Sequence, residues 1–167
     1  MKSGKVLVSV VMSVYNDEQY LKESLDSIFA QTIQYFELII VDDCSTDRTV
    51  EIIENYHDDR IRLIRNTENR GLTRNLNTAL EYVQGTYIAR MDGDDKSRPE
   101  RFEKQIAYLE QHPELMLQDA YVWRRRADLA DSGNTETAAG DDADPACIGT
   151  SWFYDARGAD YTGRFPV

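Results

Sequence analysis

The chain has 167 residues, which at about 150 residues per domain corresponds to one domain and excludes a second full catalytic domain. Its 41% hydrophobic and 29% charged residues are typical of a globular protein with a buried core. Acidic residues outnumber basic ones by 30 to 19, which gives a net charge of −11. This balance argues against binding to nucleic acid or to an anionic membrane, because both require clustered Lys and Arg.

The longest apolar stretch, residues 6–14, is far shorter than the ~20 residues of a membrane span. It leads directly into patterned sequence without the cleavage site of a signal peptide. Cys44 and Cys147 are too few for a disulfide framework and lack the spacing of metal ligands. We therefore expect no membrane span and a cytoplasmic protein, free or peripheral at the inner face of the membrane.

Apolar runs rich in β-branched residues alternate with segments of helical periodicity through the first two thirds of the chain. This alternation is typical of βαβ units around a buried, mostly parallel sheet, and so predicts an α/β fold. The predicted strands are Val6–Val14, Phe36–Val41, Ile61–Arg65 and Tyr87–Met91.

Four helices are predicted between and after these strands, each from apolar residues that recur on one helical face. Their starts are indicated by capping side chains or proline, and their ends by Gly or Pro. The boundary signals are Asp17 for the first helix, Ser45, Thr46 or Asp47 for the second, Gly71 to Gly85 for the third, and Pro99 to Pro113 for the fourth.

The composition changes sharply near Gln118. Residues 118–167 contain no Lys and five of the nine glycines, and they show neither helical nor strand periodicity. We therefore expect an α/β domain at residues 1–117 followed by an atypical, weakly patterned tail at residues 118–167. The change favours a fold that is incomplete at its C-terminus, in a chain that is truncated or whose last residues come from another reading frame.

Acidic residues follow two of the predicted strands. Asp42 and Asp43 end the second strand, and Asp92, Asp94 and Asp95 follow the fourth. Ligands of open α/β sheets bind beyond the carboxyl ends of the strands, so we expect both groups to face one crevice. A divalent cation such as Mg²⁺ or Mn²⁺ would relieve their mutual repulsion and could bridge a diphosphate. The alternative for the second group is a solvated turn that caps the next helix.

Four ordered motifs resemble the family 2 glycosyltransferases. They are VSVVMSVYN at 8–16, FELIIVDDCSTD at 36–47, NRG at 69–71 and RMDGDD at 90–95. The resemblance, which covers about residues 6–117, implies an A-type, Rossmann-like fold with helices on both faces of the sheet. It also implies transfer of a sugar, with inversion and with Mn²⁺ or Mg²⁺, in polysaccharide biosynthesis. The implied donor is a nucleotide sugar, most often UDP-linked, and the acceptor is a hydroxyl of a saccharide, a lipid-linked or another molecule.

The resemblance also implies roles for individual residues. Asp94 and Asp95, in the part that matches the DxD motif of the family, are the implied metal ligands, and Cys44 stands where the family often has Gly. The implied nucleotide-binding residues are Ser13, Tyr15, Asp42, Asp43, Arg74, Asp92 and Asp94.

The catalytic base is not identified, because in this family it lies downstream of the DxD motif, where the resemblance ends. The carboxylates available there are Asp141, Asp142, Asp155 and Asp160, each more typical of a solvated loop residue. A remnant that binds nucleotide sugar without turnover is therefore an alternative. A receiver-like, Mg²⁺-binding domain is a weaker one, because it would need its acidic pair after the first strand, where this chain has residues 15–17.

Overall fold

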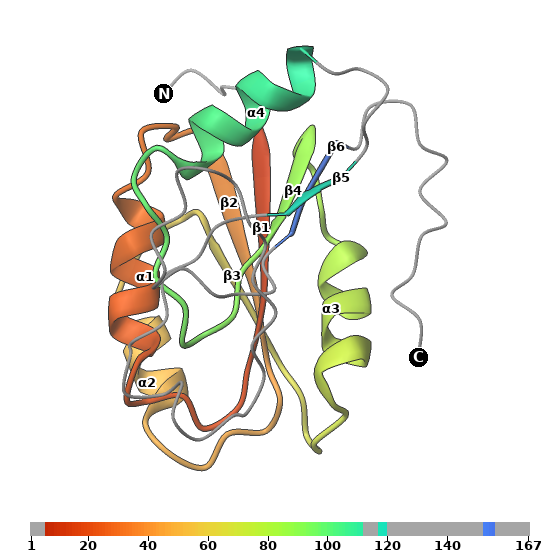
Figure 1. Ribbon diagram of the computed structural model, residues 1–167. Helices are drawn as coiled ribbons and strands as arrows, with labels where there is room; N and C mark the ends of the chain where they lie inside the picture. The colour runs from red at the N-terminus through yellow and green to blue at the C-terminus, as the bar shows by residue number, and fades with distance from the viewer. Residues whose placement is uncertain (1–5, 112–116, 120–151, 156–167) are drawn as a thin grey trace, which may run out of the picture.

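A computed structural model describes residues 6–111, 117–119 and 152–155 of the chain. Its centre is a six-stranded sheet in the order β3-β2-β1-β4-β6-β5 (Figure 1). Four strands are mutually parallel: β1 (Val8–Val14), β2 (Phe36–Asp42), β3 (Ile61–Arg65) and β4 (Tyr87–Arg90). The predicted mostly parallel α/β architecture is thereby confirmed.

Two short strands complete the sheet and were not predicted. Strand β6 (Trp152–Asp155) pairs antiparallel with β4, and β5 (Leu117–Asp119) pairs antiparallel with β6. Neither strand lies in a run of β-branched or regularly alternating residues, so neither could be recognised from the sequence. Part of the segment that follows residue 117 therefore extends the same sheet.

Helices cover both faces of the sheet, as the resemblance implies (Figure 1). One face packs against α1 (Leu21–Phe29), α2 (Thr49–Glu54) and α4 (Arg101–Gln111), and the other against α3 (Leu72–Leu80). Successive side chains of a strand point to opposite faces, so the buried residues of β1 divide between the two layers. Near the end of β1, Ser13 therefore contacts α3 on one face, whereas the turn at Asp92 contacts α1 on the other face.

Several expected helix boundaries are wrong. The residue before α1 is Tyr20, not Asp17, and it makes no side-chain capping bond. For α2, one of the three expected caps is confirmed, because Asp47 Oδ1 accepts from the amide of Thr49, the first residue of the helix, at 2.9 Å. Helix α3 ends at Leu80, five residues before the expected stop at Gly85. Helix α4 begins at Arg101, two residues after the proline expected to open it, and the expected stop at residue 113 lies outside the described residues.

Gly85 does not end a helix but lies in close contact with the backbone of the central strand, where a side chain would not fit. Its amide donates to Ser9 Oγ at 2.8 Å, and an added Cβ would lie 2.6 Å from the Ser9 nitrogen and 2.8 Å from the Val8 carbonyl carbon. Both are backbone atoms at the start of the central strand, so they cannot move aside at low cost.

We expect Gly85→Ala to lower the free energy of unfolding by about 2 kcal/mol, because it forces extra volume into a packed contact. Urea denaturation measures the change. Gln84→Ala, at the exposed neighbouring position, is the control and should stay within about 0.5 kcal/mol of the unmodified chain. Equal stabilities for the two variants would contradict the contact.

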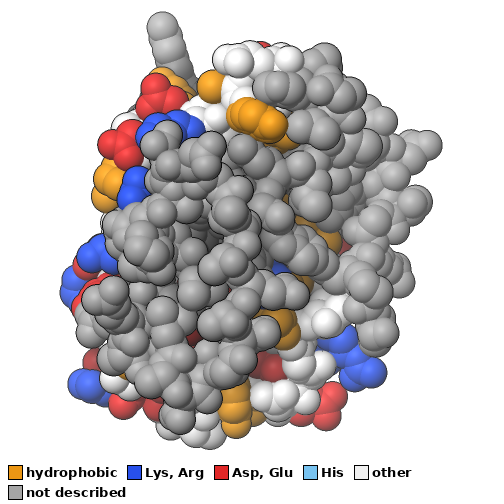
Figure 2. All heavy atoms as spheres, in the orientation of Figure 1, with side chains coloured by type: hydrophobic (Ala, Val, Ile, Leu, Met, Phe, Trp, Pro, Cys, Tyr) orange, Lys and Arg blue, Asp and Glu red, His pale blue; other side chains and the backbone are white. Residues whose placement is uncertain are grey.

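Acidic and basic side chains are intermingled along the edge of the molecule where α1 and α2 lie (Figure 2). Two exposed ion pairs belong to this region, Lys22 with Asp26 at 2.7 Å and Arg48 with Glu18 at 3.4 Å. Such exposed pairs contribute little to stability. Within the described ranges, no helix combines the length and the apolar character needed to cross a membrane.

Candidate functional site

The loops that follow β1 and β2 are joined side by side at the carboxyl edge of the sheet. The Asn16 amide donates to Ser45 Oγ at 3.0 Å, and Asn16 Oδ1 accepts from the Thr46 amide at 2.8 Å. Ser45 and Thr46, two of the three residues expected to cap α2, thus bind the neighbouring loop instead. Asn16 and Cys44 have φ values of 55° and 67°, so Cys44 occupies a left-handed position, which favours the Gly often found there in the family.

Asp43 binds the loop that precedes α3. Its carboxylate accepts from Asn66 Nδ2 at 2.9 Å and from the Arg70 and Gly71 amides at 2.7 and 2.9 Å. Burial works to raise the pKa of Asp43, but these hydrogen bonds outweigh it and hold the pKa below its ordinary value. Asp43 is therefore a buried, ionised carboxylate that fixes the start of α3, a role the sequence did not reveal.

Asp42 is also buried, at 1% exposure. Both of its carboxylate oxygens accept from the Ser45 amide at 3.3 Å. The structure thus gives Asp42 a partner within its own loop and places it at the predicted edge.

The acidic segment after β4 forms a turn whose residues face different surroundings. The Asp92 carboxylate pairs with Arg90 at 3.0 Å, and its carbonyl accepts from Ser24 Oγ of α1 at 3.1 Å. Asp94 is exposed, whereas Asp95 has only 1% exposure. The turn is therefore held against α1 while Asp94 is presented to solvent.

Asp17 belongs to this acidic group, although the sequence pointed only to a helix cap. A Cβ atom at Gly93 would lie 2.6 Å from Asp17 Oδ2, so the glycine makes room for the carboxylate. Burial raises the pKa of Asp17 to about 6 against an opposing hydrogen bond from the Tyr15 amide, and the charges of Asp94, Asp47 and Asp92 add to the increase. Only the fold brings residues 17 and 93 together, so no local pattern could have revealed the contact.

Arg101 is a second residue that the sequence did not single out. It is buried in the first turn of α4, where Nη2 donates to the Arg90 carbonyl at 3.0 Å and Nε donates to Gln105 Oε1 at 3.1 Å. Burial lowers the pKa of Arg101 to about 10, and the negative charges of Asp95 and Asp92 oppose that decrease. Arg101 therefore remains cationic at neutral pH and provides an internal positive charge behind the acidic turn.

The two acidic groups lie at the same edge of the sheet, as predicted, but they face different helices. Asp43 is bonded to the start of α3, whereas the turn at 92–95 adjoins α1 and α4. Among the described residues, no three His, Cys, Asp or Glu side chains are arranged to hold a metal ion by themselves. The exposed Asp94 carboxylate and the neighbouring negative charges nevertheless suit a hard divalent cation that takes its other ligands from a diphosphate.

The other predicted site residues also lie at or near this edge. Ser13, half-buried on β1, accepts from Asn75 Nδ2 at 3.0 Å, and Tyr15 is 49% exposed just beyond the strand. Arg74 is exposed on the first turn of α3. Of the candidate bases, Asp155 lies in β6, and those at 141, 142 and 160 lie outside the described residues.

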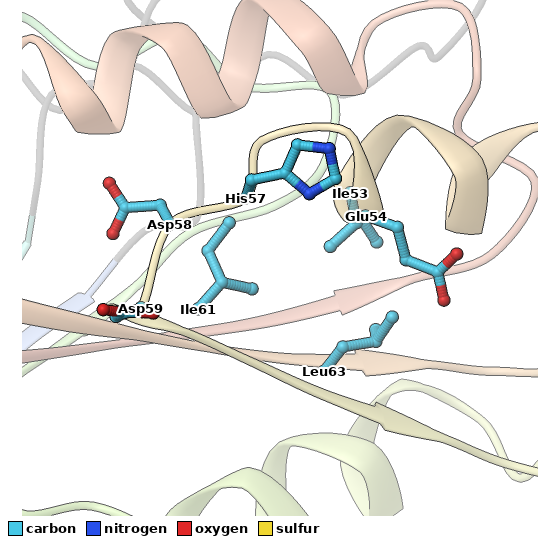
Figure 3. Close-up of a pocket in the computed structure, with 7 residues that line it drawn as sticks. All are labelled: Ile53, Glu54, His57, Asp58, Asp59, Ile61 and Leu63. Atoms are coloured by element: carbon cyan, nitrogen blue, oxygen red, sulfur yellow. The ribbon is translucent and has the colours of Figure 1, made fainter.

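A cavity of about 530 Å³ lies elsewhere, between the end of α2 and the start of β3 (Figure 3). Isoleucine and leucine side chains form its apolar part, and its charged lining groups are carboxylates, which would repel a diphosphate. It is therefore a poor candidate for a nucleotide site. Its lining residues are Ile53, Glu54, His57, Asp58, Asp59, Ile61 and Leu63.

The sheet order, the helices on both faces and the polar loops at the carboxyl edge define a Rossmann-like domain of the class that binds nucleotides at that edge. The profile of glycosyl transferase family 2 matches residues 9–153, which extends beyond the part covered by the four motifs. The chain belongs to glycosyl transferase family 2, and its fold is the A-type glycosyltransferase fold.

Proteins similar in sequence are also named glycosyltransferases. The chain is 50% identical over 115 residues to EpsE of Bacillus subtilis, provisionally named a glycosyltransferase, a match that covers 67% of this chain and 41% of EpsE. It is 37% identical over 120 residues to the amylovoran biosynthesis glycosyltransferase AmsE of Erwinia amylovora, covering 70% of this chain and 45% of AmsE. The chain thus matches less than half the length of these relatives.

Solved structures show the same fold. S. aureus TarS 1–349 in complex with UDP-GlcNAc aligns with a TM-score of 0.61 and 32% identity, covering 64% of this chain and 32% of TarS. The mannosyltransferase PcManGT of Pyrobaculum calidifontis, in complex with GDP-Man and Mn²⁺, aligns with a TM-score of 0.50 and 31% identity, covering 56% and 29% of the two chains.

Proposed function

We propose that this chain provides the donor-binding part of a cytoplasmic, metal-dependent, inverting glycosyltransferase that uses a UDP-sugar. The hydroxyl acceptor would be a saccharide or a lipid-linked saccharide of a polysaccharide pathway. The proposal rests on one observation. The same edge of the sheet carries both an exposed acidic turn and the ordered polar group around Asp43. The UDP-GlcNAc complex of TarS and the biosynthetic role named for AmsE support the donor and the acceptor class.

The acidic turn suits the diphosphate end of the donor. Asp94 would bind Mn²⁺ or Mg²⁺ together with oxygens of the diphosphate, and the negative charges of Asp92 and Asp17 would favour the cation. Asp95 is buried, and its charge acts on Arg101. The ion, when bound, neutralises the charge that develops on the departing nucleoside diphosphate. Ser13, Tyr15 and Arg74 would contact the nucleoside, and the base or ribose would lie near Asp43.

Calorimetric titration of the chain with UDP, in the presence and absence of Mn²⁺, tests the proposal. We expect Mn²⁺ to tighten UDP binding by about tenfold or more, because the ion joins two negatively charged partners that otherwise repel each other. NaCl at the same ionic strength controls for simple charge screening. Equal affinities with and without Mn²⁺, or no heat of binding in either case, would contradict it.

A binding protein without turnover is the second candidate. It is considered because the proposed donor-binding residues all lie between residues 13 and 94 and none of them is assigned as the catalytic base. Release of labelled sugar from UDP-GlcNAc in Mn²⁺ separates the two: binding with release supports the transferase, and binding without release supports the binding protein.

A further inference from the structure

Helix α1 presents a row of polar side chains to the segment that follows β4. Ser24 and Ser27 of the helix and Gln31 just beyond its end recur at spacings of three and four residues, so they lie on one face. Their exposures are only 1%, 5% and 2%. The segment of residues 92–102, which begins with the acidic turn, runs beside this face on its way into α4 (Figure 1). Buried polar groups need hydrogen-bond partners, and this segment supplies partners to all three.

Ser24 binds the carbonyl group that closes the acidic turn. Its Oγ donates to the Asp92 carbonyl at 3.1 Å. The same carbonyl accepts from the Asp95 amide at 3.2 Å, which is the bond from the first to the fourth residue of a β-turn. A carbonyl oxygen has two lone pairs, so both bonds can form together. Ser24 therefore fixes the turn at the point where its backbone closes around Asp94.

Ser27 fixes the backbone on the other side of Asp94. Its Oγ accepts from the Ser97 amide at 2.9 Å and donates its own hydrogen to the Ser24 carbonyl at 2.7 Å. The hydroxyl hydrogen is thus used within α1, which leaves the oxygen to accept from the acidic segment. Asp94 lies between two backbone groups that are both bonded to the helix.

Gln31 and its neighbour hold the same segment where it enters α4. Gln31 Nε2 donates to the Arg98 carbonyl at 2.7 Å, and Gln31 Oε1 accepts from the Phe102 amide at 3.1 Å. The Thr32 amide donates to the Pro99 carbonyl at 2.8 Å. The segment therefore cannot slide along α1 without breaking several buried hydrogen bonds at once, which is costly.

From this arrangement we propose that Ser24 and Ser27 are positioning residues, which hold the acidic turn in the conformation in which Asp94 binds a divalent cation. The proposal rests on the proposed function, because it presupposes a metal ion at Asp94. The Asp94 side chain is exposed, so its position depends on the backbone on either side. A turn that is already ordered loses little conformational entropy when the ion binds, whereas a loose turn must be ordered at that moment.

Calorimetric titration with UDP at several Mn²⁺ concentrations tests the positioning role. We expect Ser24→Ala and Ser27→Ala each to raise the apparent Kd for Mn²⁺ by about tenfold, as is typical for the loss of a group that orients a metal ligand. The affinity for UDP without Mn²⁺ should stay within about twofold of the unmodified chain. The loss is therefore confined to the part of the affinity that depends on the ion.

Stability separates positioning from a general structural effect. Alanine has the highest helix propensity, which offsets much of the lost hydrogen bond, so the urea midpoint of both variants should change little. Ile28→Val is the control, because it removes a buried carbon from the same helix on the side that packs in the core. It should lower the urea midpoint and keep the response to Mn²⁺.

Amide hydrogen exchange of the metal-free chain gives a second measurement, which needs neither ion nor nucleotide. The Asp95 amide should exchange about fivefold faster in Ser24→Ala, because the Asp92 carbonyl that accepts it is held by one hydrogen bond fewer. Ile28→Val should leave this rate unchanged, since the turn opens locally.

Four outcomes would overturn the inference alone: an unchanged apparent Kd for Mn²⁺ in both serine variants, equal loss of UDP affinity with and without Mn²⁺, the same loss in Ile28→Val, or unchanged exchange of the Asp95 amide in Ser24→Ala. In each case the unmodified chain still binds UDP with the help of Mn²⁺. If the unmodified chain shows no response to Mn²⁺, the proposed function fails and the inference fails with it.

Discussion

Asp94→Ala should remove the Mn²⁺-dependent part of UDP affinity. Asp94 is the exposed carboxylate of the acidic turn, and its charge adds to the increase in the pKa of Asp17. Loss of a group that orients a metal ligand typically costs about 10–100-fold in metal affinity, and loss of the ligand itself should cost at least as much. Calorimetry with UDP at several Mn²⁺ concentrations measures the loss.

The fold of this variant should be unaffected, because the substitution removes a charge that repels its neighbours. We expect the free energy of unfolding to stay within about 0.5 kcal/mol. Glu100→Ala removes one negative charge from an exposed position shortly after the turn and should retain the response to Mn²⁺. If both variants lose the response equally, overall charge and not a ligand at position 94 is responsible.

Arg101→Met should produce the largest loss of stability. The guanidinium donates to the Arg90 carbonyl at 3.0 Å and to Gln105 Oε1 at 3.1 Å, and Asp95 beside it is buried. Removing one member of a buried charge pair leaves the other uncompensated, which typically costs about 3–5 kcal/mol. Urea denaturation at neutral pH should show a corresponding decrease in the free energy of unfolding.

Lys104→Met is the matched control, since Lys104 is an exposed cation on the same helix, and it should change stability by about 0.5 kcal/mol or less. Asp95→Ala should also be destabilising, in contrast to Asp94→Ala, because it removes the buried carboxylate whose negative charge favours the cationic form of Arg101. A loss below about 1 kcal/mol in Arg101→Met would show that the acidic turn does not need this internal charge.

The different expectations for Asp94 and Asp95 show where sequence reasoning was limited. As adjacent members of one acidic motif, the two residues are equivalent in the sequence, and both were predicted as metal ligands. The turn exposes Asp94 and buries Asp95. The assignment of Asp94 as a ligand remains a prediction, and the structure favours it over Asp95 by exposure alone.

The four parallel strands and the helical segments between them could be predicted from the sequence, because β-branched runs and helical spacing are local patterns. The position of the acidic motifs at strand ends followed from the same patterns. Helix starts were less predictable. Asp17, expected as a cap, lies instead beside Gly93, and the side chains of Ser45 and Thr49 accept hydrogen bonds from the loop after β1.

The sequence by itself determined the α/β class, the strand order along the chain and the presence of acidic motifs at strand ends, since the period of apolar residues fixes which face of each element is buried. Only the tertiary structure decided which polar groups meet: Asp17 with the turn at Gly93, Arg101 with the Arg90 carbonyl, and Asp43 with Ser13 through Asn66 and Asn75. The physical reason is that a polar side chain takes its partner from whatever lies within about 3 Å in the folded chain, and residues far apart in sequence supply those partners.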